Sequence, residues 1–363
     1  MNKNQSNKAA LRENEGVSSQ ESTNKDGISN LKRKRQEQPS VEELLKGILK
    51  SNTAALSRGI TLIESQNLSH KSKANALIQN CLEHTKPSVR IGITGVPGVG
   101  KSTYIEALGT YLTNLGNKVA VLAVDPSSSL SKGSILGDKT RMDVLVRNPN
   151  AFIRPSAAGE SLGGVARHTR EAITLCEAAG YDVILIETVG VGQSETSVHS
   201  MVDFFLLLKL AGAGDELQGI KRGIIEMADA IIINKADGNN KNAAKLAMLE
   251  FKRALHLYPA KASNWIPKVI MCSALKQIGI EESWTLIKDY LDLAKSELYF
   301  TKKRQEQNMF WLIQSIENQL KDQFFKDSVI NKEMESQIEL INNNKRSPFA
   351  AAEYLLNLQK TQS

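Results

Sequence analysis

The sequence Val-Arg-Ile-Gly-Ile-Thr-Gly-Val-Pro-Gly-Val-Gly-Lys-Ser-Thr, residues 89–103, decides the fold of this chain. An apolar run comes first, a glycine-rich turn follows, and an amphipathic stretch over 103–115 comes last. This order matches the strand, G-x-x-x-x-G-K-S loop and helix of a phosphate-binding loop. The residues predicted to bind the nucleotide here are Gly95, Val96, Pro97, Gly98, Val99, Gly100, Lys101, Ser102 and Thr103.

Each residue type in this loop has a physical task. Glycines allow consecutive backbone N–H groups to converge on phosphate oxygens, and the N-terminus of the following helix adds a favourable partial positive charge. We expect Lys101 to reach the β- and γ-phosphates and the Ser102 hydroxyl to coordinate Mg²⁺. An ordinary glycine-rich turn is the alternative, but it explains neither the flanking strand and helix nor the Lys and Ser.

Short β-branched runs alternate with longer amphipathic stretches between Val89 and Ser273, which is typical of a parallel sheet covered by helices. We predict an α/β fold, specifically a P-loop NTPase three-layer sandwich with a mostly parallel sheet. Each predicted strand ends where a polar motif begins, as expected where ligands bind beyond the carboxyl ends of strands. The predicted strands are 89–94, 119–124, 183–187, 204–209, 230–234 and 269–272.

An N-K-x-D motif closes the fifth predicted strand, with Asn234, Lys235 and Asp237 as its defining residues. The Asp237 carboxylate can accept hydrogen bonds from the ring N–H and the amino group of guanine. Adenine offers no matching pair, and a buried carboxylate facing a ring acceptor would lose its hydrogen bonds. The motif therefore predicts GTP and GDP as ligands. A second segment is expected to support the base, namely Ser273, Ala274 and Leu275.

Acidic residues follow or end two apolar strands, Asp125 after 119–124 and Glu187 after 183–186. An unpaired buried carboxylate is costly, so an acid in such a place usually meets a cation or water. We expect both to join Ser102 around Mg²⁺, with Asp138 as a further candidate ligand; solvated loop acids are the alternative. Residues 187–190 also have the acid-x-x-Gly layout of a GTPase second switch, which senses the γ-phosphate.

The predicted catalytic residues are Lys101, Glu187 and Gln193. Gln193 and Glu195 both lie near enough to the second switch to orient an attacking water, and spacing alone does not select between them. No obvious arginine finger is present, so slow intrinsic hydrolysis stimulated by a partner is expected. The arginine candidates are Arg141, Arg154, Arg167 and Arg170. His168 and His199 are further catalytic candidates, although a lone histidine near a loop is more often structural.

Composition sets limits on partners and surroundings. The formal net charge is +7, but basic residues are spread along the chain without an aromatic-interleaved stripe, so nucleic acid is not an expected partner. The longest apolar stretch, 204–213, is interrupted by Lys209 and is far shorter than the roughly 20 residues of a membrane span. Three widely separated cysteines give neither a disulfide framework nor a zinc pattern, which fits a cytoplasmic protein.

Four regions follow from changes in the pattern along the chain. Residues 1–38 are polar, so a disordered tail is expected, with a basic run at 32–35 that is more often solvated than docked. Residues 39–86 are predicted to be helical, because Ser40 is placed as an N-cap and apolar residues recur at helical spacing. Residues 87–298 form the predicted GTPase domain. Residues 299–363 form a predicted helical arm, with helices within 304–325, 331–341 and 348–358.

Five blocks of sequence carry a family resemblance. They are Val-Asp-Pro-Ser-Ser-Ser (124–129), Ser-Ile-Leu-Gly-Asp-Lys-Thr-Arg-Met (134–142), Leu-Gly-Gly-Val-Ala (162–166), Glu-Thr-Val-Gly-Val-Gly-Gln-Ser-Glu (187–195) and Gly-Ala-Gly-Asp-Glu-Leu-Gln-Gly-Ile-Lys (212–221). In sequence and order they resemble the MeaB/ArgK-type GTPases that accompany methylmalonyl-CoA mutase, the methylmalonic aciduria type A protein family. The resemblance covers 40–358.

The resemblance implies a GTPase chaperone that gates adenosylcobalamin delivery to a B12-dependent acyl-CoA mutase and protects or reactivates it. It also implies a homodimer formed through the C-terminal arm. Ser102, Asp125, Asp138 and Glu187 would surround Mg²⁺, and residues 212–222 would form a third switch that reports the nucleotide state to the mutase. Two positions depart from the family pattern and bear on switch kinetics, Lys132 in place of Gly and Ala211 in place of a frequent Pro.

Three other functions compete with this one. A metal-insertion GTPase needs soft ligands, and the sequence has no Cys-x-Cys, Cys-x-x-Cys or His-rich tract. A transport-linked P-loop kinase would transfer phosphate to a protein, and no acceptor-binding module is evident. A nucleotide-dependent scaffold would use the helical arm and leave hydrolysis incidental.

Overall fold

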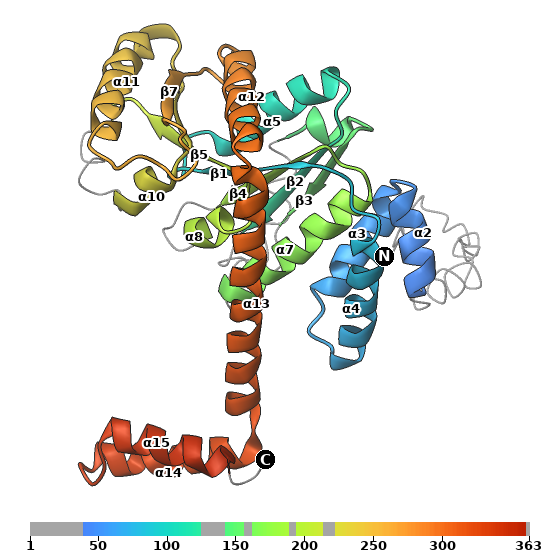
Figure 1. Ribbon diagram of the computed structural model, residues 1–363, viewed down its shortest axis with the longest axis vertical. Helices are drawn as coiled ribbons and strands as arrows, with labels where there is room; N and C mark the ends of the chain where they lie inside the picture. Colours follow the sequence, from blue (N-terminus) through green and yellow to red (C-terminus); the bar gives the residue numbers. More distant parts are fainter. Residues whose placement is uncertain (1–38, 125–141, 156–161, 189–193, 213–221, 361–363) are drawn as a thin grey trace, which may run out of the picture.

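A seven-stranded sheet forms the centre of the computed structural model, which describes residues 39–124, 142–155, 162–188, 194–212 and 222–360 (Figure 1). The strand order is β3-β2-β4-β1-β5-β6-β7, and every neighbouring pair is parallel. The predicted α/β fold is therefore confirmed. The strands are β1 (Val89–Thr94), β2 (Val119–Val124), β3 (Ala151–Arg154), β4 (Val183–Thr188), β5 (Phe204–Leu210), β6 (Ala230–Asn234) and β7 (Lys268–Met271).

The predicted strands agree with the structure to within one residue at each end, but one strand was missed. β3 is a four-residue strand with the sequence Ala-Phe-Ile-Arg at one edge of the described part of the sheet, where it pairs with β2. It is short and has a single β-branched residue, Ile153, so its sequence gives only a weak strand signal. The strand therefore depends on its pairing with β2, which its own sequence does not reveal.

The strands are apolar on both faces because helices cover both faces. Along β4, Val183 and Leu185 pack into one core, whereas Ile184 and Ile186 pack into the other. This alternation gives the continuous hydrophobic runs that parallel strands require. On the first face lie α5 (Lys101–Asn114) and α12 (Ile280–Ser296). On the second face lie α7 (Leu162–Ala178), α8 (Ser194–His199), α10 (Arg222–Met227) and α11 (Lys241–Leu255).

Between residue 39 and β1, three helices add an outer layer on α7. They are α2 (Val41–Leu49), α3 (Thr53–Ile63) and α4 (Leu68–Leu82). The N-cap expected at Ser40 is present as a capping box: its hydroxyl accepts from the Glu43 N–H at 3.1 Å, and the Glu43 carboxylate accepts from the Ser40 N–H at 2.9 Å. Leu56 and Ile60 of α3 are fully buried in the same core as α7, and α3 and α4 both contact α7. The predicted tail over 1–38 lies outside the described residues.

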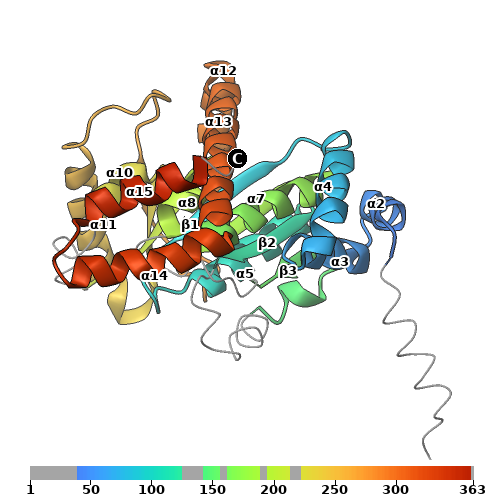
Figure 2. The same ribbon diagram turned by 90° about the horizontal axis from the view of Figure 1, so that it is seen from below.

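A long arm follows α12 and leaves the sheet (Figure 1). It consists of α13 (Tyr299–Lys326), α14 (Ser328–Asn342) and α15 (Pro348–Lys360). Seen from below, α14 and α15 lie side by side at the far end of α13 (Figure 2). At 28 residues α13 is about 42 Å long. Within the described ranges, no helix is both long and apolar enough to cross a membrane.

Side-chain hydrogen bonds fix the first turns of α13 to the segment between α8 and β5. Lys303 Nζ donates to the Asp203 carbonyl at 2.7 Å, and Gln307 Nε2 donates to the Val202 carbonyl at 2.8 Å. Trp311 Nε1 donates to the Ser200 carbonyl at 3.1 Å. Because Lys303 and Gln307 are buried, these bonds form away from water and order the base of the arm.

Buried carboxylates line the amino-terminal edge of the sheet. Asp203 accepts from the Arg90 backbone N–H at 2.8 Å and pairs with Arg304 at 2.7 Å. Asp229 accepts from the Phe205 backbone N–H at 2.9 Å and pairs with Lys261 at 2.7 Å. Burial opposes ionisation of Asp229, but Lys303 and Lys261 hold its pKa below the ordinary value. These acids thus join strand starts to the arm and the α11–β7 connection.

His199 generates a prediction about pH and stability. Its ring stands edge-on to Phe205, with centroids 5.5 Å apart, and burial, reinforced by Lys303 and Lys261 against the opposing charge of Asp229, lowers its pKa to about 4. Between pH 6.5 and 4 the unfolded chain therefore binds more protons than the folded one, so stability falls as the pH falls. We expect a loss of about 2 kcal/mol from pH 7.5 to 5.

The control for that prediction is His199→Phe, which keeps an aromatic ring against Phe205 and cannot titrate. Urea unfolding followed by tryptophan fluorescence at both pH values measures the difference. From pH 7.5 to 5, the free energy of unfolding of His199→Phe should fall by about 2 kcal/mol less than that of the unmodified protein. Equal losses would show that His199 does not titrate with the lowered pKa.

Candidate functional site

The loop between β1 and α5 has a backbone that requires glycine at two positions. Gly100, the N-cap of α5, has φ of 93°, and a Cβ built there would lie 2.7 Å from Asn234 Nδ2. A Cβ on Gly95 would lie 2.6 Å from the Leu208 carbonyl oxygen of β5. Side chains are excluded at both places, so the loop backbone approaches β5 and β6 closely.

The other loop residues divide between anchoring and exposure. Val99 is fully buried, Val96 is partly buried against the same core, and Pro97 and Gly98 are exposed at the tip. The Val99 N–H donates to the Val96 carbonyl at 3.2 Å, which closes the turn. The tip is therefore open to a ligand while its flanks are fixed in the core.

Lys101 is buried at the start of α5, and its ammonium group lies over the loop. Nζ donates to the Gly95 carbonyl at 2.8 Å and to the Val96 carbonyl at 3.4 Å. A phosphate bound in the loop would offer this cation stronger, charged acceptors than carbonyl oxygens. Ser102 and Thr103 occupy the next positions of the first turn, where the helix N–H groups favour an anion.

Ser102 meets one of the predicted acids. Its hydroxyl donates to Glu187 Oε1 at 3.3 Å, because Glu187 is the penultimate residue of β4, lies beside β1 and faces α5. A hydroxyl and a carboxylate oxygen are the hard ligands that Mg²⁺ prefers, so this pair fits the ion. Among the described residues no group of three His, Cys, Asp or Glu side chains could hold a metal by itself. Asp125, Asp138 and Gln193 lie outside the described residues.

The side chain of Asn234 joins the two predicted halves of the site. Its Nδ2 donates to the Val99 carbonyl of the loop at 2.9 Å. Its Oδ1 accepts from the Ala274 backbone N–H at 3.2 Å. The sequence motif assigned Asn234 to the base-reading segment and did not reveal this bridging position, because the partners are distant in sequence.

Asp237 lies beside Ser273, whose hydroxyl donates to the Asp237 carboxylate. The Ala236 N–H donates to the Cys272 carbonyl at 3.0 Å, which continues the β6–β7 pairing past the strand ends. Lys235 adopts φ of 56°, a left-handed conformation that turns the chain after Asn234. Leu275 is 75% exposed, so it is available to lie against a planar ring.

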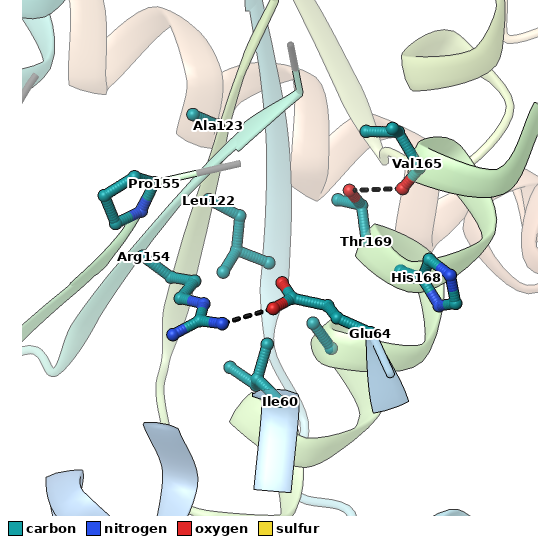
Figure 3. A pocket seen from close by; sticks show the side chains of 10 residues that line it. Ile60, Glu64, Leu122, Ala123, Arg154, Pro155, Val165, His168 and Thr169 are labelled. Carbon is teal, nitrogen blue, oxygen red and sulfur yellow. Dashed lines mark hydrogen bonds and ion pairs between the residues drawn. The ribbon is translucent and has the colours of Figure 1, made fainter. Parts of the chain in front are cut away.

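The described arginine candidates are engaged elsewhere. Arg154, at the end of β3, pairs with Glu64, the C-cap of α3 (Figure 3). Arg167 pairs with Glu171 of its own helix at 2.9 Å, and Arg170 donates to Asn308 of α13 at 3.0 Å. The remaining candidate, Arg141, lies outside the described residues. None of these three contacts involves a residue of the phosphate loop.

The cavity drawn in Figure 3 is distinct from the phosphate loop. It lies between α3, the ends of β2 and β3, and α7, and holds about 20 Å³. That volume suits a single water rather than a nucleotide. His168 borders it and lies 3.6 Å from the Glu171 carboxylate, a contact within α7. His168 thus takes part in the packing of α7, and His199 lies in the core contact with Phe205 described above.

The fit around Gly100 yields a prediction. Gly100→Ala should lower the free energy of unfolding for two reasons. The new side chain stands at positive φ, and its contact with Asn234 should cost about 1–3 kcal/mol in addition. Displacing Asn234 should also weaken binding of a fluorescent guanine nucleotide. Gly116→Ala is the matched control, because Gly116 has φ of 88° and open space around it. Equal unfolding free energies for the two variants, with unchanged nucleotide affinity, would contradict the expected contact.

Comparisons with known proteins agree with this geometry. The family model described as "Methylmalonyl Co-A mutase-associated GTPase MeaB" matches residues 56–329. "GTPase ArgK" of Escherichia coli is 41% identical over 323 residues, which cover 89% of this chain and 98% of the relative. A probable GTPase of Mycobacterium tuberculosis is 44% identical over 319 residues, covering 88% and 95% of the two chains.

A mitochondrial protein and a solved structure extend the similarity. The "Methylmalonic aciduria type A homolog, mitochondrial" of Mus musculus is 44% identical over 337 residues, covering 90% of this chain and 81% of that protein. The solved "LAO/AO transport system kinase" is 36% identical with a TM-score of 0.71, covering 88% of this chain and 97% of its own. The loop geometry, the family match and these relatives lead to one conclusion: the chain is a P-loop GTPase and belongs to the MeaB family.

Proposed function

We propose that this GTPase uses Mg²⁺ and a GTP cycle to gate adenosylcobalamin delivery to a B12-dependent acyl-CoA mutase, and to protect or reactivate that mutase. The observation that carries the proposal is the family match over residues 56–329, which spans the sheet, the nucleotide site and all of α13. The family is described as methylmalonyl-CoA mutase-associated, so the client we propose is methylmalonyl-CoA mutase or a sister enzyme.

The proposed roles in hydrolysis follow from position. Lys101 would neutralise charge on the β- and γ-phosphates, since its ammonium already lies over the loop at 2.8 Å from the Gly95 carbonyl. Ser102 and Glu187 would hold Mg²⁺ together with Asp125 and Asp138. The ion would supply neutralisation of developing negative charge on the phosphates. Gln193 is the proposed residue that orients the attacking water.

The proposed reading of guanine depends on Asp237, with Asn234, Lys235 and the segment Ser273 to Leu275 around it. Ser273 supports this role because its hydroxyl holds the Asp237 carboxylate in place. A fixed carboxylate loses little entropy on accepting hydrogen bonds from a ring N–H and an amino group.

Asp237→Asn tests that reading. The amide can no longer accept both guanine hydrogen bonds, but its N–H group can donate to the extra carbonyl of xanthine. We expect GTP affinity to fall by about a hundredfold, equivalent to about 3 kcal/mol, while affinity for xanthosine triphosphate rises. Fluorescence competition measures both. Unchanged selectivity between the two nucleotides would refute the assignment of Asp237.

The client proposal is tested with purified methylmalonyl-CoA mutase and, in parallel, isobutyryl-CoA mutase. The full chain is mixed with each mutase in the presence of GDP or a non-hydrolysable GTP analogue. Complex formation is followed by gel filtration, and cobalamin transfer by absorbance. We expect a complex with one mutase, a difference between the two nucleotides, and faster GTP turnover in the complex. No contact with either enzyme in either state would contradict the proposal.

A transport-linked kinase is the second candidate, because the solved structure at 36% identity carries that title. The two functions differ in the acceptor of the γ-phosphate, which is water in one case and a protein in the other. Labelled GTP incubated with the chain and membrane extracts separates them, because only a kinase leaves label on protein. A metal-insertion role has less support, because the three cysteines are each buried and unbridged, Cys81, Cys176 and Cys272.

Homodimerisation through the arm is also proposed, and α13 supports it. Beyond its base the helix exposes an apolar stripe at alternating spacings of four and three residues, typical of a helix that packs along another helix. The members of this stripe are 48–60% exposed, and they are Met309, Ile313, Ile316 and Leu320. Such a row in water is the kind of surface that a second copy would cover.

Ile316→Asp should disrupt that dimer, since burying an unpaired carboxylate in an apolar seam is unfavourable. Asn318→Asp is the control, because it adds the same charge on the opposite side of α13. Light scattering coupled to gel filtration is expected to give a dimer for the control and a monomer for Ile316→Asp. A dimer in both variants would exclude the stripe as the interface.

A further inference from the structure

Two buried threonine hydroxyls meet where β1 and β4 end. Thr94 is the last residue of β1 and Thr188 is the last residue of β4. The Thr188 hydroxyl donates to the Thr94 hydroxyl at 2.8 Å. The two side chains are 1% and 0% exposed, so the bond lies wholly inside the protein. Neither the nucleotide motifs nor the family description assigns this pair a role.

The pair lies directly behind the nucleotide site. Thr94 immediately precedes Gly95, whose carbonyl accepts from Lys101, and Thr188 immediately follows Glu187. Side chains alternate along a strand, so Glu187 faces Ser102 on α5 while Thr188 faces the opposite side. On that side α8 packs against both strands. The hydroxyl pair therefore fixes Thr188, the residue after Glu187, on the face of the sheet opposite Ser102.

Backbone pairing does not replace this bond. The ladder between β1 and β4 runs from Val89 with Val183 to Ile93 with Glu187, and Thr188 is next paired with Val124 of β2. Thr188, the last residue of β4, is thus joined to β1 through its side chain. Two oxygens approach to 2.8 Å, whereas apolar carbons in contact stay about 3.5–4.0 Å apart. An apolar pair would separate these atoms by about 1 Å more than the hydroxyl pair does.

We propose that the Thr94–Thr188 hydroxyl pair positions Glu187 for the GTPase reaction by holding the end of β4 against the start of the phosphate loop. This inference rests on the proposed role of Glu187 beside Ser102. The threonine side chains are buried on the face of the sheet opposite Ser102, so their role would be that of positioning residues. A displacement of about 1 Å at a reacting site can reduce turnover by up to about a hundredfold.

The decisive variant is the double substitution Thr94→Val with Thr188→Val. Replacing both partners by groups of the same shape leaves no unpaired buried hydroxyl, so the melting temperature should stay close to that of the unmodified protein. We expect kcat to fall about tenfold or more and the Mg²⁺ concentration for half-maximal turnover to rise. Metal-free affinity for fluorescent GDP should not change, because the loop itself is intact.

Two further variants separate positioning from general packing. Thr188→Ser keeps the hydroxyl, so its kcat and its Mg²⁺ dependence should match those of the unmodified protein. Thr169→Val is the matched control: Thr169 is also buried, but its hydroxyl donates to the Val165 carbonyl of its own helix at 3.0 Å. This control should turn over GTP like the unmodified protein.

The inference is overturned if the double variant keeps the unmodified kcat and Mg²⁺ dependence, or if Thr188→Ser loses both as the double variant does. Glu187→Gln, measured in the same assays, tests the underlying role. If Glu187→Gln leaves the Mg²⁺ dependence unchanged, the proposed role of Glu187 fails. If it shifts that dependence and the double valine variant does not, only the positioning inference fails.

Discussion

The nucleotide site depends on the side-chain amide of Asn234. One end of the amide holds the Val99 carbonyl of the phosphate loop and the other holds the Ala274 N–H. A carboxylate or an aliphatic side chain could not do both, because a carboxylate only accepts and an aliphatic group does neither. The contact also requires Gly100 to lack a side chain, since a Cβ there would lie 2.7 Å from the same amide nitrogen. The phosphate loop and the segment predicted to read the base are thus joined through one side chain.

The sequence predicted this frame in parts. Local motifs identified the loop, the strand ends and the acid at Glu187, because each depends on residue types at fixed spacing. The contact of Ser102 with Glu187 follows from the adjacency of β1 and β4, which a motif implies only if the strand order is known. The short strand β3 carries no pattern of its own, and its existence depends on pairing with β2. The bridging role of Asn234 had no signal, since Val99 and Ala274 are remote from it in the chain.

The two edges of the sheet carry different chemistry. The carboxyl edge holds the loop, Ser102 and Glu187. The amino edge holds Asp203 and Asp229, each of which accepts a backbone N–H and pairs with a basic residue. Removing one partner of such a buried pair leaves an uncompensated charge, which is costly. Because Arg304 and Lys303 come from the arm, the base of the arm belongs to the same electrostatic network as the starts of β1, β5 and β6.

The strand order also sets the timing of assembly during synthesis. β1 emerges early, yet its neighbours in the sheet are β4 and β5, whose first residues are Val183 and Phe204. A ribosome adds about 5–20 residues per second, so the first strand waits roughly 5–20 seconds for a partner. During that interval its apolar faces and the glycine-rich loop are unprotected, and the contact of the loop with Asn234 forms only after β6 has been made. The central place of β1, which gives the finished enzyme its site, therefore exposes the nascent chain to aggregation and to chaperones.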